Sequence, residues 1–125
     1  MKNTLERTNS FTDLAVNFKE SKYVLLVCRE GYVQEKTLHY ALNVCKRIGA
    51  GLDILCVSHS REVALQEMLT NVPHKLIVVK GALYEALVDY VKTHTAVTCA
   101  VISHADSLDI VGKWSAADCP LVVVT

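Results

Sequence analysis

The sequence has no excess of charge of either sign, and it has no long apolar run. Thirteen Lys and Arg residues balance thirteen Asp and Glu residues, so the formal net charge is zero. A neutral chain has no basic field to attract nucleic acid or an anionic membrane, and we expect neither as a partner. The longest apolar runs, such as Tyr23–Cys28, are far shorter than the roughly 18 residues of a membrane span.

Paired cysteines and a secretion signal are also missing. The five cysteines are odd in number and form no Cys-x-x-Cys spacing, so they fit neither a zinc site nor a disulfide framework. We interpret them as reduced thiols that act as small apolar side chains. The polar start, Met1–Arg7, lacks the apolar core of a signal peptide, so we expect a cytoplasmic protein.

The chain contains no proline-rich or glycine/serine-rich linker that would divide it into domains. We predict one α/β domain over residues 21–125, preceded by an amphipathic helical arm over residues 1–20. Apolar residues recur at helical spacing over residues 11–19, and Ser10 can cap that helix. The arm could cover a sheet edge or a dimer partner, or it could dock onto another protein or a membrane surface.

Five apolar runs alternate with helical patterns. The predicted strands are Tyr23–Cys28, Leu52–Val57, Lys75–Lys80, Val97–Ile102 and Leu121–Val124. Helices are predicted over Gln34–Ile48, over a segment that ends near Pro73 and over Leu83–His94, with about two further turns around Ser107–Ala117. Strands that are apolar throughout and alternate with helices form a parallel sheet covered on both faces. The predicted fold class is therefore α/β, a five-stranded parallel open sheet with strand order 3-2-1-4-5, helices on both faces and an extra N-terminal helix.

Polar residues follow the first and fourth predicted strands. Ligands of open α/β sheets bind at the carboxyl ends of the strands, where the strand order reverses. Arg29 after the first strand, with Ser103 and His104 after the fourth, would lie at that crevice and could hold an anionic group. The alternative is that Arg29 pairs with Glu30 or Asp106 and that His104 is a solvated loop residue. The sequence contains no nucleophile elbow, His-x-x-Glu-His motif or phosphate-binding P-loop, so catalysis has less support than anion binding.

The run from Tyr23 to Thr125 resembles the universal stress protein family. The matching segments are Arg47–Leu52 at the end of the first helix, the turn Lys80–Leu87 into the third helix, and Cys119–Val124 at the end of the chain. The resemblance implies a Rossmann-like sheet of the adenine nucleotide alpha hydrolase-like type. It also implies a homodimer that pairs through the terminal strand Leu121–Val124.

Two departures from that family concern its nucleotide site. Nucleotide-binding members carry an aspartate at the end of the first strand, at a position that falls on or next to Arg29 in this sequence. They also carry a glycine-rich stretch after the fourth strand, whose backbone N–H groups hold phosphates; here Ser103–Asp118 has one glycine, Gly112. We therefore expect no cofactor and no ATP binding in the family manner, with AMP or ATP as the nucleotides left to test.

Two functions remain open. The first is a non-enzymatic regulatory or stress-response module of the universal stress protein type, dimeric and with a protein partner still to be identified. The second is a small-molecule sensor that binds AMP or another anion through Arg29, Ser103 and His104. A receiver-like domain fits less well, because no acidic cluster at the strand ends supplies oxygen ligands to a metal ion.

Overall fold

The computed structural model describes residues 22–30, 32–58, 69–115 and 119–125. Its strands are β2 (Tyr23–Arg29), β3 (Gly51–Val57), β4 (Lys75–Val79), β5 (Val97–Ser103) and β6 (Leu121–Val124). Its helices are α1 (Glu35–Ile48), α3 (Leu83–Thr93) and α4 (His104–Ser107). The predicted helical arm over residues 1–20 and most of the predicted helix before Pro73 lie outside the described residues.

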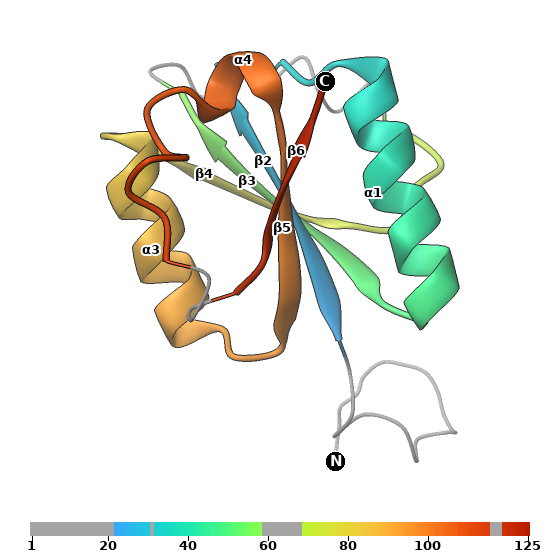
Figure 1. The fold of residues 1–125 in the computed structure, drawn as a ribbon. Coiled ribbons are helices and arrows are strands. Elements are labelled where there is room, and N and C mark those ends of the chain that lie inside the picture. Colours follow the sequence, from blue (N-terminus) through green and yellow to red (C-terminus); the bar gives the residue numbers. More distant parts are fainter. Residues whose placement is uncertain (1–21, 31, 59–68, 116–118) are drawn as a thin grey trace.

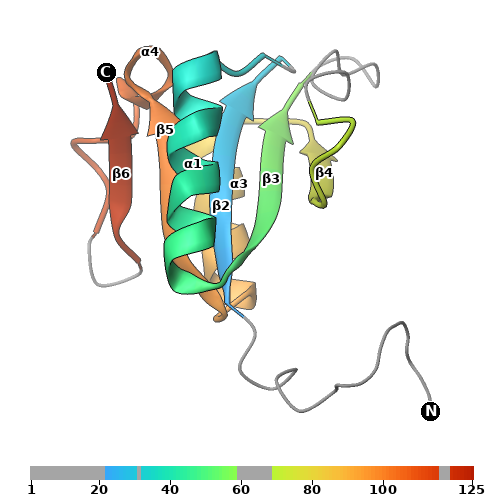
Figure 2. The same ribbon diagram turned by 90° about the vertical axis from the view of Figure 1, so that its right-hand side faces the viewer.

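The five strands form one sheet in the order β4-β3-β2-β5-β6, and every neighbouring pair is parallel. The predicted order 3-2-1-4-5 is therefore confirmed. β2 lies in the centre of the sheet, where Leu26 pairs with Ile54 of β3 on one side and with Val101 of β5 on the other. Figure 2 shows the sheet with α1 in front of it and β4 and β6 at its two edges.

Helices cover both faces of the sheet, as predicted, with α1 on one face and α3 on the other (Figure 1). Alternate residues of β2 point to the two faces of the sheet. Leu26 packs in the hydrophobic cluster between the sheet and α1, and Leu25 packs in the cluster between the sheet and α3. Both side chains are fully buried. A strand buried on both faces has to be apolar throughout, which explains the uninterrupted run in the sequence.

Helix α1 follows from local sequence signals. Leu38, Ala41 and Val44 recur at helical spacing and form its buried stripe. The helix ends at Gly49, whose φ of 67° lies in the left-handed region that glycine adopts without a steric penalty. The N–H of Gly49 donates to the backbone oxygen of Cys45 and closes the last turn.

The segment after β5 differs from the prediction. Helix α4 begins directly at His104 and spans four residues, and turns then continue over Leu108–Lys113, so the helical turns begin earlier than predicted. The side chain of Ser107 donates to the backbone oxygen of His104 at 2.7 Å, a local bond that competes with regular helix geometry. Figure 1 shows α4 at the carboxyl end of the sheet.

No disulfide joins the five cysteines, all of which lie in the described part of the chain. Cys28, Cys56 and Cys119 are buried, and Cys45 and Cys99 are partly buried. Cys28 and Cys56 lie opposite each other in β2 and β3, and burial is the main cause that raises the pKa of the Cys28 thiol. Among the described residues, no helix has both the length and the apolar character needed to cross a membrane.

Candidate functional site

The three residues predicted to form a site lie at the same edge of the sheet. Arg29 ends β2, Ser103 ends the neighbouring strand β5, and His104 begins α4. This is the carboxyl edge, beside the central strand. The strand order that the sequence predicts thus brings the backbone of all three residues to one edge of the sheet.

The side chains of Arg29 and Ser103 nevertheless point to opposite faces of the sheet. Side chains along a strand alternate between faces. Cys28 lies on the face covered by α1, so the next residue, Arg29, points to the α3 face, where it lines a pocket beside the start of α3. Ser103 points to the α1 face, and its Oγ lies 3.0 Å from Oγ1 of Thr37. One small ligand therefore cannot contact both side chains from the same side of the sheet.

Arg29 is engaged by two acidic residues of the segment that follows β5. Its Nη2 donates to Oδ2 of Asp109 at 3.0 Å and to the backbone oxygen of Asp106 at 3.5 Å. Its Nε lies 3.9 Å from Oδ1 of Asp106. The pairing with Asp106 is one of the two that the sequence left open, and Asp109 is an addition from the structure.

Asp106 is the less exposed of these two carboxylates. Its side chain is 22% exposed, against 75% for that of Asp109. Burial raises the pKa of the Asp106 carboxyl, and the positive charge of Arg29 opposes this rise. A further anion placed beside Arg29 would have to approach both carboxylates, which makes the immediate surroundings of this guanidinium unfavourable to phosphate.

The hydroxyls of Ser103 and Thr37 form a buried pair. The two residues are 3% and 0% exposed. Burial of a hydroxyl without a hydrogen-bond partner is costly, and here each supplies a partner to the other. Ser103 therefore links the end of β5 to the first turn of α1. His104, in contrast, is exposed, and its backbone oxygen accepts the bond from Ser107.

Glu30 has an unusual backbone conformation that the sequence did not reveal. Its φ is 52°, in the left-handed region that residues other than glycine adopt infrequently. Its N–H donates to the backbone oxygen of Val57 at 2.7 Å, and its Oε1 accepts a bond from Ser58 at 3.4 Å. These bonds join the carboxyl end of β2 to the carboxyl end of β3. The ion pairs of Arg29 are with Asp106 and Asp109, and not with Glu30.

The pocket beside Arg29 has a volume of about 560 Å³ and carries charges of both signs. The start of α3 contributes Glu85 to its wall, and the turn after α4 contributes Lys113. The Lys113 amine lies 5.2 Å from the centre of the Tyr84 ring, a cation–π contact. In the part of the chain that the structure describes, no three His, Cys, Asp or Glu side chains form a group that could hold a metal ion.

Comparison with known proteins identifies no family for this chain. No protein-family model matches the chain, and no curated protein matches it.

Proposed function

We propose that this chain is a non-enzymatic regulatory or stress-response module of the universal stress protein type that does not bind ATP in the manner of that family. The observation that carries the proposal is the engagement of Arg29 by Asp109 and Asp106 at the carboxyl edge. A phosphate in the crevice would have to be neutralised by Arg29, but protein carboxylates already neutralise the charge of this residue. Signalling would then depend on protein contacts instead of nucleotide occupancy.

Two further features support the absence of a phosphate site. Ser103 faces α1 and Arg29 faces α3, so the two do not converge on one anion. The segment between β5 and β6 has one glycine, Gly112, and phosphate cradling needs glycine because a side chain would block the close approach of the backbone. Sensing of AMP or another anion through Arg29, Ser103 and His104 has less support for the same reasons.

The proposed homodimer pairs through β6. This strand lies at one edge of the described sheet and bonds to β5 on one side. All four of its residues, Leu121–Val124, are partly buried and apolar. An edge strand of this composition, without charged side chains, is prone to add a strand from another chain. We propose a second copy of this chain as that partner.

Sedimentation analysis of the full chain tests the dimer. Lysine on an edge strand blocks strand pairing, so Val123→Lys should give a monomer. Val78→Lys places lysine on the opposite edge strand, β4, and this variant should remain a dimer. A wild-type chain that stays monomeric at high concentration would remove the dimer from the proposal.

Thermal unfolding with ATP, AMP and inorganic phosphate tests the crevice. A ligand at about 100 times its Kd stabilises a fold by roughly 2.7 kcal/mol, an effect that is easily measured. We expect no specific stabilisation by any of the three. Stabilisation that disappears in Arg29→Ala would instead support the anion sensor.

A further inference from the structure

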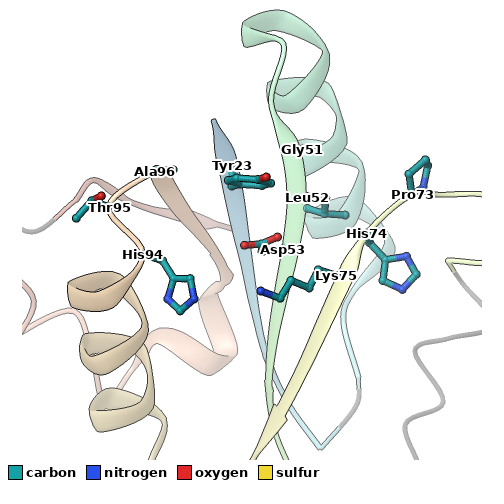
Figure 3. Close-up of a pocket in the computed structure, with 10 residues that line it drawn as sticks. All are labelled: Tyr23, Gly51, Leu52, Asp53, Pro73, His74, Lys75, His94, Thr95 and Ala96. Carbon is teal, nitrogen blue, oxygen red and sulfur yellow. The ribbon is translucent and has the colours of Figure 1, made fainter. Parts of the chain in front are cut away.

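The opposite, amino edge of the sheet contains a second pocket, with a volume of about 580 Å³. Its walls are the starts of β2, β3 and β4 and the segment that follows α3 (Figure 3). The volume lies in the range of small-molecule sites. This pocket shares no lining residue with the pocket beside Arg29, so it is argued independently of the proposed function.

A buried carboxylate lines this pocket. Asp53, in β3, is only 5% exposed although it lies in a strand of otherwise apolar residues after Gly51. The phenol of Tyr90 in α3 donates to its Oδ2 at 2.7 Å. A carboxylate has about four acceptor sites on its two oxygens, and among the described side chains Tyr90 supplies one donor. Asp53 can therefore accept further hydrogen bonds from a ligand. Such bonds would offset the cost of burying its charge.

A lysine lies next to Asp53 on the same face of the sheet. Lys75 begins β4 and is the register partner of Asp53 in β3. Figure 3 shows its amine directed into the space between Asp53 and His94. Among the residues that the structure describes, Lys75 forms no ion pair. The pocket therefore contains one carboxylate and one ammonium group that do not neutralise each other by direct contact.

Aromatic groups hold the walls of the pocket in place. The ring of His94 stacks on that of Tyr90, with centroids 3.8 Å apart and planes inclined by 13°. The ring of Tyr23 lies against β3 at Gly51, where an added Cβ would come within 3.1 Å of it. The side chain of His74 points away from Asp53 in Figure 3, and its Nδ1 contacts the backbone oxygen of Val72 at 2.6 Å. His74 is therefore at the rim and does not contribute to the pair of charges.

We propose that this pocket binds a small zwitterion of the free amino acid class, with its ammonium group on Asp53 and its carboxylate on Lys75. A ligand with only a positive charge would meet the ammonium of Lys75, and a ligand with only a negative charge would meet the buried carboxylate of Asp53. A ligand with both charges is complementary to both residues, and charge-assisted hydrogen bonds are among the strongest available in a protein. The apolar ring of Tyr23 can then cover its carbon atoms.

NMR titration of the isotope-labelled full chain tests the proposal. The probes are a panel of free α-amino acids and β-alanine, set against propionate and propylamine, which each carry one of the two charges. At least one amino acid should give saturable shifts of the backbone amides of Asp53, Lys75 and Thr95, and the single-charge compounds should not. No saturable shift with any amino acid up to about 10 mM, or equal binding of a single-charge compound, would overturn the proposal.

Variants test the roles of Lys75 and Asp53 in binding the two charged groups of the ligand. Lys75→Gln should weaken binding roughly tenfold or more, because it removes one charge-assisted hydrogen bond. Lys80→Gln, just after the other end of the same strand, is the matched control and should leave the affinity unchanged. Asp53→Asn should also weaken binding. If that variant does not fold, Lys75→Gln remains decisive because Lys75 is exposed, and unchanged affinity in Lys75→Gln would refute the site.

Discussion

Nη2 of Arg29 lies 3.0 Å from Oδ2 of Asp109, so the end of the central strand is joined to the turn that follows α4. The two residues are 80 positions apart in the chain. Their side chains are 34% and 75% exposed, which places the pair in the class of surface ion pairs. This contact therefore contributes little to the stability of the fold. Its main effect is to orient the Arg29 guanidinium toward Asp109.

Asp109→Asn should change the free energy of unfolding by less than about 1 kcal/mol, because exposed ion pairs contribute little and are screened by salt. Denaturant unfolding of the variant and the wild type measures the difference. Asp89→Asn on the exposed side of α3 is a control that removes the same charge away from Arg29. A loss of more than about 2 kcal/mol in Asp109→Asn alone would mean that the pair is structural.

The buried hydroxyl pair of Thr37 and Ser103 should show strong coupling. Either Thr37→Val or Ser103→Ala leaves the other hydroxyl buried without its partner, at a cost of about 1–3 kcal/mol. The double variant removes both polar groups and should cost less than the sum of the single changes. A double-mutant cycle from denaturant unfolding measures this coupling, and strictly additive costs would show that the 3.0 Å contact is not a hydrogen bond in solution.

Tyr90→Phe should destabilise the fold by about 1.5–3 kcal/mol near neutral pH, because the buried carboxylate of Asp53 loses its donor. Burial, followed by the hydrogen bond to Asp53, raises the pKa of the Tyr90 phenol. The native state therefore keeps a proton that the unfolded chain releases above about pH 10, so this contribution to stability falls as the pH rises past that value.

The pH dependence of unfolding for wild type and Tyr90→Phe tests this sign. The difference in stability between them should narrow above about pH 10. Tyr32→Phe, at a tyrosine that is 67% exposed, is the control and should follow the wild type. A difference between wild type and Tyr90→Phe that widens at high pH would contradict the assignment of Tyr90 as a protonated donor.

Gly49→Ala should cost about 1–2 kcal/mol, because a φ of 67° forces an L side chain into the left-handed region. The cost is confined to the backbone, since an added Cβ at Gly49 meets nothing within 4 Å. Gly112→Ala also meets nothing within 4 Å but has no positive φ, so it should be neutral or slightly stabilising. Thermal unfolding of both variants gives the comparison, and equal effects would remove the role of Gly49 in ending α1.

The fold could be predicted from the sequence because each element has a local cause. The run Tyr23–Cys28 is apolar at every position, as a central parallel strand requires, and Gly49 marks the end of α1. The last strand was predicted with the bounds that β6 has, Leu121–Val124. The start of α4 at His104 was missed, because a mixed polar segment has no apolar periodicity that fixes its position.

The candidate sites were only partly predictable, because they depend on contacts between distant segments. The sequence could place Arg29 and Ser103 at one edge of the sheet, but the faces to which their side chains point depend on the register of β2 and β5. In that register Val27 pairs with Ile102, so Ser103 shares a face with Cys28 and not with Arg29. The contact between Tyr90 and Asp53 spans 37 positions and was not predicted. Its one signal in the sequence was an acidic residue inside the apolar run Leu52–Val57.

Titration of the isotope-labelled full chain with ATP and magnesium, followed by NMR of the Arg29 side chain and of the backbone amides after β5, measures occupancy of the carboxyl-edge crevice directly. We predict no saturable shift up to about 5 mM ATP, because the carboxylates of Asp106 and Asp109 already engage Arg29. Saturable shifts at these positions with a Kd below about 0.1 mM, lost in Arg29→Ala, would contradict the proposal that this chain does not bind ATP there.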